Sequence, residues 1–165
     1  MIYLKKANLE DAKKQYEFLK DTPEDENGFL NKYYSYSYED FVDFALPEMI
    51  KYSQGIDLPK GYVPQTFYFM WDDNNIVGLF KLRHILTDSL RNGAGHIGYA
   101  IHKSYRGKGY ATKGLVIEKA KEVIKENEIY LSVHINNYAS LKVQLNNRAY
   151  IHHSDENEHY TRIKI

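Results

Sequence analysis

The chain has 165 residues, which suits one domain with a sizeable core. It carries 22 basic and 22 acidic side chains, so no net field favours nucleic acid or an anionic membrane as a partner. The absence of cysteine excludes disulfides, thiolate metal sites and a cysteine nucleophile. No signal-peptide core opens the sequence and no apolar run approaches membrane-spanning length, so we expect a cytoplasmic protein.

Apolar spacing in the first half of the chain predicts a strand, two helices and a pair of strands. Asn8 is a good cap for the first helix, and Pro47 should kink or divide the second. The tyrosine-rich segment 33–38 is interpreted either as an aromatic wall of an acceptor pocket or as rings packed on the domain edge. The two strands are joined by a four-residue hairpin connection. The expected ranges are 2–5 (strand), 9–19 and 37–52 (helices), and 66–71 and 76–85 (strands).

The second half predicts strands that alternate with helices. Thr87 should cap a single helical turn in the connection 87–95. Asn136 or Asn137 should cap the last helix. The expected ranges are 96–102 (strand), 110 to about 126 (helix), 129–135 (strand), 139–145 (helix), and 150–152 and 160–165 (strands).

Residues 106–111, Arg-Gly-Lys-Gly-Tyr-Ala, link the strand 96–102 to the helix that follows it. The first N–H groups of a helix have no intrahelical acceptor, and the helix dipole adds partial positive charge there. Glycine tolerates positive φ and lacks the Cβ that would block a close ligand. The segment therefore predicts a cradle for a pyrophosphate.

The spacing excludes two common phosphate-binding motifs. A P-loop needs Gly-Lys-Ser/Thr, but Gly114 is followed by Leu115. A Rossmann fingerprint needs a third glycine where this chain has Thr112. A regulator that binds ATP or NAD through the glycines is thus disfavoured, and no acidic ribose-binding residue stands at the end of a second strand.

Arg106, Gly109 and Ala111, directly after a strand, resemble motif A of the GNAT superfamily of acyl-CoA N-acyltransferases. Residues 137–140, Asn-Tyr-Ala-Ser, are similar to the start of motif B, and several other stretches resemble a bacterial subgroup of predicted acetyltransferases. The resemblance implies a single α/β (α+β) domain over residues 1–165. It also implies a mixed, mostly antiparallel twisted sheet of about seven strands, with helices on both faces. The fourth and fifth strands, 96–102 and 129–135, would be splayed apart.

The resemblance further implies acetyl-CoA as co-substrate and no metal. Its pyrophosphate would bind N–H groups of the glycine segment, and its pantetheine arm would pair with the backbone of the fourth strand. Asn137 would both cap its helix and contact the cofactor. The implied cofactor-binding residues are Tyr99, Ala100, Ile101, Arg106, Gly107, Lys108, Gly109, Tyr110, Ala111, Asn137 and Ser140.

In such enzymes the primary amine of a small molecule or peptide attacks the thioester directly, and homodimers are common. A general acid or base would usually stand where this chain has Gln144, Ser132 and Gly95, and none of these can serve. The substitutes are His96, His134 and Tyr138, each of which also has an ordinary structural interpretation as a strand-end or covering residue.

Three questions stay open at the level of sequence: whether the protein catalyses, what its acceptor is, and what Arg83 and His84 do. The missing acid and base residues favour, as an alternative function, a CoA-binding or sensory domain without catalysis. The tyrosine rings hint at an aromatic or cationic acceptor. Arg83 and His84 are interpreted as lining the acceptor side or as packing at a strand end. The histidines 152, 153 and 159 are interpreted as surface strand residues, because their spacing matches no metal site.

Overall fold

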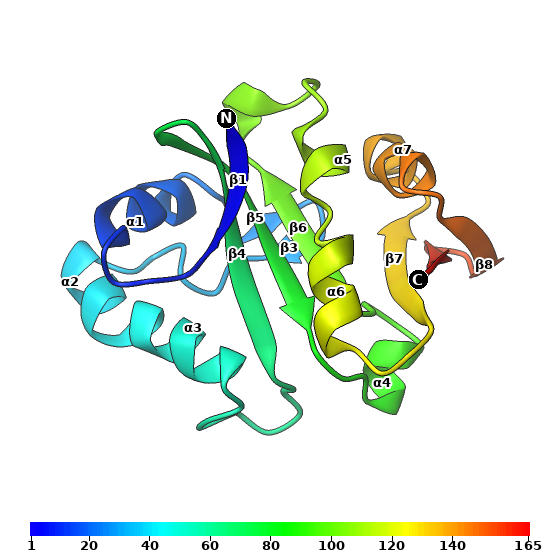
Figure 1. Cartoon of the computed structure of the whole chain (residues 1–165), viewed down its shortest axis with the longest axis horizontal. Helices are drawn as coiled ribbons and strands as arrows, with labels where there is room; N and C mark the ends of the chain where they lie inside the picture. Colours follow the sequence, from blue (N-terminus) through cyan, green and yellow to red (C-terminus); the bar gives the residue numbers. More distant parts are fainter.

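Two antiparallel sheets form the centre of the structure, a computed structural model that describes residues 1–165 (Figure 1). The larger sheet has the strand order β1-β4-β5-β6 and the smaller has β7-β9-β8, with β2 and β3 as a separate ribbon. The strands are β1 (Ile2–Lys6), β2 (Asp25–Glu26), β3 (Phe29–Leu30), β4 (Gln65–Asp72), β5 (Asn75–Arg83), β6 (Ile97–Ile101), β7 (Glu128–His134), β8 (Tyr150–Ser154) and β9 (Glu158–Lys164). The helices are α1 (Ala12–Lys20), α2 (Tyr38–Asp40), α3 (Leu46–Ser53), α4 (Asp88–Arg91), α5 (Tyr110–Gly114), α6 (Ile117–Val123) and α7 (Tyr138–Asn146).

Helices cover both faces of the larger sheet: α1, α2 and α3 lie on one side and α5 and α6 on the other (Figure 1). Side chains of β4 alternate between these faces, as successive residues of a strand must. Phe67 and Phe69 enter one core cluster with α1 and α3. Tyr68 and Met70 enter a second cluster, with Ala120 of α6. The expected α/β class and two-sided cover are confirmed.

The two larger sheets touch where β6 begins. A single antiparallel bridge joins Gly95 to Leu131, and the N–H of His96 donates to the carbonyl of Tyr130 at 2.7 Å. Gly95 has φ +68°, and a Cβ at this position would lie 2.1 Å from the Tyr130 oxygen, so the crossing requires glycine. Beyond it β6 pairs only with β5 and β7 only with β9, which is the expected splay.

Pro47 divides the second helical segment as expected. Residues Phe41–Ala45 form a π-helical turn, in which the N–H of Leu46 donates to the carbonyl of Phe41, and α3 follows with Pro47 in its first turn. Proline has no N–H to donate, so it is tolerated at the start of a helix and not inside one. The chain therefore passes from the π turn directly into α3.

The sequence predicted one continuous helix after the glycine loop, and this prediction was wrong. It breaks between α5 and α6, where Leu115 has ψ 84°, and it ends at Val123. A Cβ on Gly114 would lie 2.5 Å from the ring of Phe80 in β5. This close approach brings the chain onto the sheet, where Leu115 and Val116 are buried.

The β4–β5 hairpin also differs from expectation. Asp72 pairs with Asn75, so the connection has two residues, Asp73 and Asn74, instead of four. Asp73 has φ +51°, a left-handed conformation that short hairpin turns require and that Asp tolerates. The strands are consequently longer at this end than the apolar pattern indicates.

Candidate active site

One edge of β6 faces the gap between the sheets. Residues 96 and 102 exchange hydrogen bonds with β5, through Arg83 N–H to His96 O at 2.7 Å and His102 N–H to Val77 O at 3.0 Å. Because such bonds alternate along an antiparallel strand, the N–H and C=O groups of Tyr99 and Ile101 point into the gap. Ala100 was also expected to contribute there, but this alternation turns its backbone toward β5.

The glycine loop presents a row of free N–H groups. Gly107 and Gly109 have φ +74° and +78°, and no atom lies within 4 Å of where a Cβ would stand on either. The N–H groups of residues 107–112 donate to no backbone carbonyl of the chain. Free donors around an open glycine turn fit the oxygens of a pyrophosphate.

The side chains of the loop are turned away from these donors. Arg106 donates from Nε to the carbonyl of Ile101 at 3.1 Å and pairs with Glu26 in the β2–β3 ribbon. Tyr110 donates from its hydroxyl to Asp72 at 2.6 Å, and Lys108 lies over the ring of Tyr105. The backbone donors of the loop are thus left open.

Across the gap, α7 begins with the expected cap. Asn137, and not Asn136, accepts the N–H of Ser140 at 3.2 Å. The Ser140 hydroxyl lies 2.5 Å from the hydroxyl of Tyr99, so a side chain of β6 reaches across to α7. Burial raises the pKa of Tyr99 above its ordinary value. Its phenol therefore stays protonated at neutral pH.

Two of the three positions without an acid or base, Gly95 and Gln144, have structural roles. Gly95 forms the crossing between the sheets. Gln144 is buried, donates to the carbonyl of Ser132 at 3.3 Å and accepts the hydroxyl of Thr161 at 2.6 Å. It therefore joins α7 to β7 and β9.

His96 is fully buried, with both ring nitrogens engaged. Nδ1 accepts the N–H of Tyr130 at 2.9 Å, so the proton resides on Nε2, which lies 3.2 Å from Glu126. Burial lowers the pKa of His96 despite the opposing effect of Glu126. With no free lone pair, His96 holds β6 against β7 and is poorly placed to accept a proton from an amine.

His134 and Tyr138 lie at the open end of the gap and are exposed. His134 ends β7, and its Nδ1 accepts the N–H of Asn136 at 3.2 Å, which leaves Nε2 free. Tyr138 begins α7 with 74% of its surface exposed. Of the three candidates, these two keep a group that a ligand can reach.

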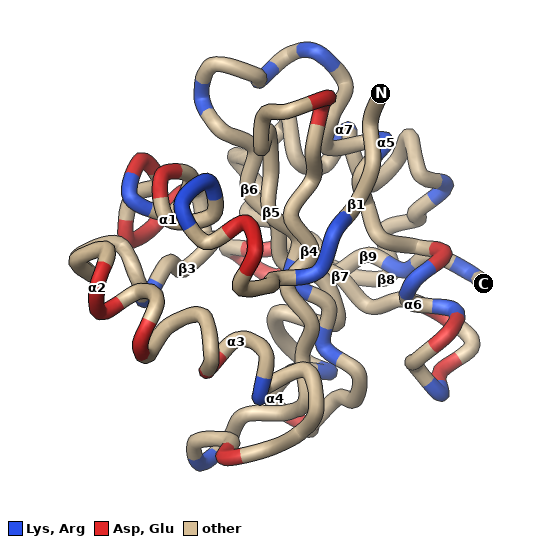
Figure 2. The backbone as a smooth tube through the Cα atoms, turned by 60° about the vertical axis from the view of Figure 1, so that its left-hand side comes forward, with Lys and Arg blue, Asp and Glu red and all other residues tan.

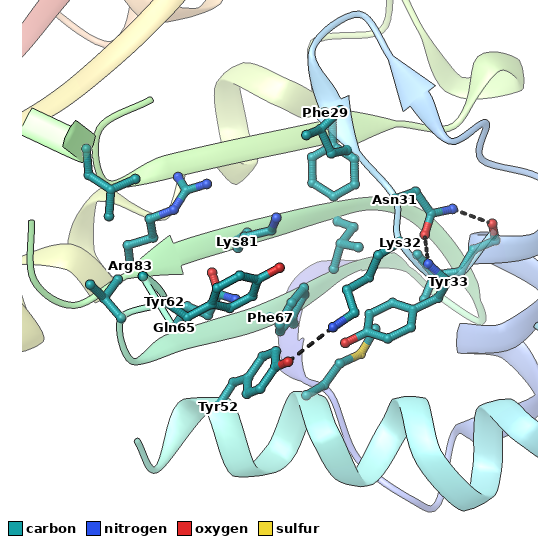
Figure 3. Close-up of a pocket in the computed structure, with 17 residues that line it drawn as sticks. Phe29, Asn31, Lys32, Tyr33, Tyr52, Tyr62, Gln65, Phe67, Lys81 and Arg83 are labelled. Carbon is teal, nitrogen blue, oxygen red and sulfur yellow. Dashed lines mark hydrogen bonds between the residues drawn. The ribbon is translucent and has the colours of Figure 1, made fainter. Parts of the chain in front are cut away.

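A cavity of about 320 Å³ opens on the face of the larger sheet that α1 and α3 cover (Figure 3). Its walls come from the segment 29–33, α3, the loop 61–63 and strands β4 and β5. Tyr33 is the only member of the tyrosine-rich segment that lines it. Tyr34 and Tyr38 are exposed, so most of that segment follows the edge-packing interpretation.

Two basic residues of β5 also line this cavity, Lys81 and Arg83. Arg83 was anticipated as a candidate, whereas its neighbour His84 bonds to Thr66 at 2.7 Å and does not line the cavity. Lys81 was missed, although a lone lysine in the apolar run 76–82 is the signal that would have found it. Hydrophobic strands rarely place a lysine on a covered face without a ligand or partner.

Charge is unevenly spread over the surface. Figure 2 shows basic positions along the loop after β6 and acidic positions along α2 and α3. No helix in the structure has the length and apolar character needed to cross a membrane. No three His, Asp or Glu side chains converge as metal ligands, and His152 and His153 are exposed on β8.

Comparison with known proteins agrees with this geometry. The family model described as "Acetyltransferase (GNAT) family" matches residues 17–144. A GNAT acetyltransferase from Streptococcus pneumoniae is 16% identical, with a TM-score of 0.66 and 100% of both chains covered. The N-acetyltransferase PseH of Campylobacter jejuni, solved with acetyl coenzyme A, is 18% identical, with a TM-score of 0.60 and 99% of both chains covered.

A spermidine N-acetyltransferase SpeG chimera from Vibrio cholerae and hSSAT is 15% identical, with a TM-score of 0.60 and coverage of 99% of this chain and 95% of that one. No curated protein sequence matches the chain. Identities this low show a shared fold, while the family match extends over well over half of the chain. The chain therefore belongs to the GNAT family of acetyltransferases.

Proposed function

We propose that the protein transfers the acetyl group of acetyl-CoA to a primary amine of a small molecule or peptide. One observation carries the proposal: the unpaired backbone groups of Tyr99 in β6 and the free N–H groups of residues 107–112 border the same gap. An extended ligand with alternating donors and acceptors fits the strand edge, and its phosphates fit the loop. Structural neighbours solved with acetyl coenzyme A support this cofactor.

Binding falls mainly to the backbone. Tyr99 offers its N–H and C=O groups to the ligand's amide arm, and Ile101 offers its N–H, because Arg106 already donates to the Ile101 carbonyl. Gly107 and Gly109 let the phosphates approach the loop. Acetyl-CoA supplies an activated thioester carbonyl, on which a nearby β6 N–H would stabilise developing negative charge. Asn137 and Ser140 close the gap from the α7 side.

Tyr99 replaces the missing general acid in this proposal. Its hydroxyl reaches α7 one turn before Gln144, the position at which a proton donor is usual in the family. The side chain that sequence comparison finds missing from α7 would thus be supplied by β6. His134, whose Nε2 is free at the open end of the gap, is the proposed acceptor of the amine's proton, directly or through water.

A second candidate function is a CoA-binding domain without turnover. The occupation of the usual acid and base positions by Gln144, Ser132 and Gly95 favours it. Both candidates bind acetyl-CoA, and only the enzyme releases CoA when offered an amine.

The test is thermal melting with acetyl-CoA, CoA, ATP and NAD in parallel, followed by a CoA-release assay with amines. Ligand at about 100 times Kd adds roughly 2.7 kcal/mol, a rise in Tm of roughly 5 to 10 °C for a chain of this size. Gly109→Glu should abolish the acetyl-CoA shift, because a carboxylate would stand where phosphate binds. Gly55→Glu is the matched control, since Gly55 also has positive φ and lies at the end of α3, outside the gap. A shift with ATP or NAD alone would refute the proposal.

A further inference from the structure

The cavity beside α3 contains more positive charge than its own residues neutralise. Lys32, Lys81 and Arg83 all line it (Figure 3). Lys32 is paired, with its ammonium 3.0 Å from Glu48 and 3.1 Å from the hydroxyl of Tyr52. The only carboxylate nearby is therefore already used, and it also accepts the hydroxyl of Tyr33 at 2.6 Å.

Lys81 has no such partner. Its ammonium lies over the rings of Phe29 and Phe67, 5.3 and 5.8 Å from their centres, and it forms no ion pair within the chain. Burial, with the nearby charges of Arg83 and Lys32, lowers the pKa of Lys81 to about 8. Lys81 is half-buried, and a partly desolvated cation without an anion is costly to a fold, so a ligand that brings the anion gains free energy there.

Arg83 adds to the excess of positive charge in the cavity. One of its terminal nitrogens donates to the carbonyl of Gly95 at 3.1 Å, and no carboxylate pairs with it. A guanidinium has five N–H donors, so most of its donor capacity is free. Lys81 and Arg83 lie two residues apart on β5 and hence on the same face of the sheet.

The cavity is also next to the gap in which the acetyl group would be delivered. Lys81 pairs directly with Gly98 of β6, the residue before Tyr99. Gly98 has no side chain that could separate Lys81 from the edge of β6. The closest atom to a Cβ built on Gly98 belongs to Phe29, at 3.9 Å. An anion on Lys81 would therefore hold the rest of a small molecule beside the β6 edge.

We propose that the acceptor of this acetyltransferase is a small amine that also carries an anionic group, a carboxylate or phosphate, held by Lys81 and Arg83. The proposal rests on the proposed function and names its substrate class. The cavity volume of about 320 Å³ suits a small molecule, and its rings offer an apolar surface for a side chain. Lys32 and Lys81 already occupy the faces of the rings, which argues against the cationic acceptor that the tyrosines hinted at.

The experiment compares matched amines that differ only in the anion. The pairs are phenylalanine against phenethylamine and leucine against isoamylamine, and the phosphonate analogue of phenylalanine separates phosphate-like from carboxylate recognition. Each is assayed by CoA release and, without acetyl-CoA, by thermal melting. At least one anionic amine should exceed its neutral partner at least about tenfold in kcat/KM, because a charge-assisted hydrogen bond adds at least that factor to binding. The same amine should raise Tm in the absence of acetyl-CoA.

Variants of Lys81 identify the anion's partner. Lys81→Met should reduce the preference to within about threefold, whereas Lys81→Arg should retain most of it, because the charge persists. Lys60→Met is the control, since Lys60 is exposed on a nearby loop and does not line the cavity.

Several results would overturn the proposal. They are equal use of neutral and anionic amines, an unchanged preference in Lys81→Met, and failure of every anionic amine to react or to shift Tm. Turnover of neutral amines alone would refute the anion site and leave the acetyltransferase intact. Binding of an anionic amine to a protein that never releases CoA would support the anion site and refute the enzyme.

Discussion

The hydroxyl of Tyr99 lies 2.5 Å from that of Ser140, so a residue of the central sheet reaches across the gap to the helix on its far side. The ring also stacks on Phe80, with 5.7 Å between centres, which fixes its direction. This contact holds a phenol one turn from Gln144, a position on α7 whose side chain cannot supply a proton.

Tyr99→Phe tests that role. It keeps the ring and its packing, so the fold should lose only the hydrogen bond, about 1 kcal/mol. If Tyr99 protonates the departing thiolate, kcat should fall about 10²- to 10⁴-fold with KM for acetyl-CoA little changed. Ser140→Ala, which removes the partner and keeps the phenol, should cost far less. Steady-state CoA release measures kcat for both variants. A kcat for Tyr99→Phe close to the parent's would exclude Tyr99 as the general acid.

Gln144→Leu should damage stability and leave catalysis alone. It removes the two buried hydrogen bonds that Gln144 makes to Ser132 and Thr161, at a cost of about 1 to 3 kcal/mol. Adding Thr161→Val should recover part of this loss, because the hydroxyl left without a partner is then absent. Urea unfolding measures both, and the activity per folded molecule should stay close to the parent's. A selective loss of kcat at unchanged stability would instead place Gln144 in the chemistry.

Gly95→Ala should be among the most damaging single changes. The new Cβ would lie 2.1 Å from the Tyr130 oxygen, and alanine would also have to adopt φ +68°. Gly28→Ala is the control, because Gly28 has φ +90° with nothing within 4 Å of the Cβ position, so it carries the strain without the clash. Strain alone costs about 1 to 2 kcal/mol, and the Gly95 variant should lose clearly more in urea unfolding. Equal losses would mean that the crossing has room to relax.

Stability should fall as the pH drops below about 6.5. Burial lowers the pKa of His96 and of His84, so the unfolded chain takes up their protons before the folded one does. The contribution is complete above the unfolded pKa of about 6.5 and is lost progressively as pH falls toward the folded values. Glu126 opposes the shift in His96, while Arg91 and Arg162 add to it.

His96→Gln should reduce this pH dependence. One histidine contributes at most about 1.4 kcal/mol per pH unit to the slope. Urea unfolding between pH 5 and 7 measures the slope of stability against pH. This pH window lies above the titration of carboxylates with lowered pKa values, such as Asp11 and Glu48. An unchanged slope in the variant would show that His96 is accessible and titrates freely.

Local signals in the sequence predicted the outline of the fold well. Ser37, Thr87 and Asn137 each accept a backbone N–H at the start of a helix, as side chains of their type do. The division at Pro47 and the splay of the two central strands also agree with expectation. These features depend on short stretches of chain or on a resemblance that extends over the whole domain.

The features that sequence could not give depend on contacts between distant segments. Which backbone groups of β6 face the gap depends on its register with β5, which turns the backbone of Ala100 toward β5 and that of Tyr99 and Ile101 into the gap. The break at Leu115 follows from contact between Gly114 and Phe80. The unpaired charge of Lys81 becomes visible only once the neighbouring carboxylates are located in space.

The single bridge at Gly95 has a consequence for solubility. It leaves two strand edges, one on β6 and one on β7, facing each other across a gap inside one domain. Unpaired edges are sites at which chains associate through added strands. A molecule lying in the gap would occupy these edges as an extra strand does. If acetyl-CoA binds in the gap as proposed, the protein saturated with it should resist aggregation on storage better than the empty protein.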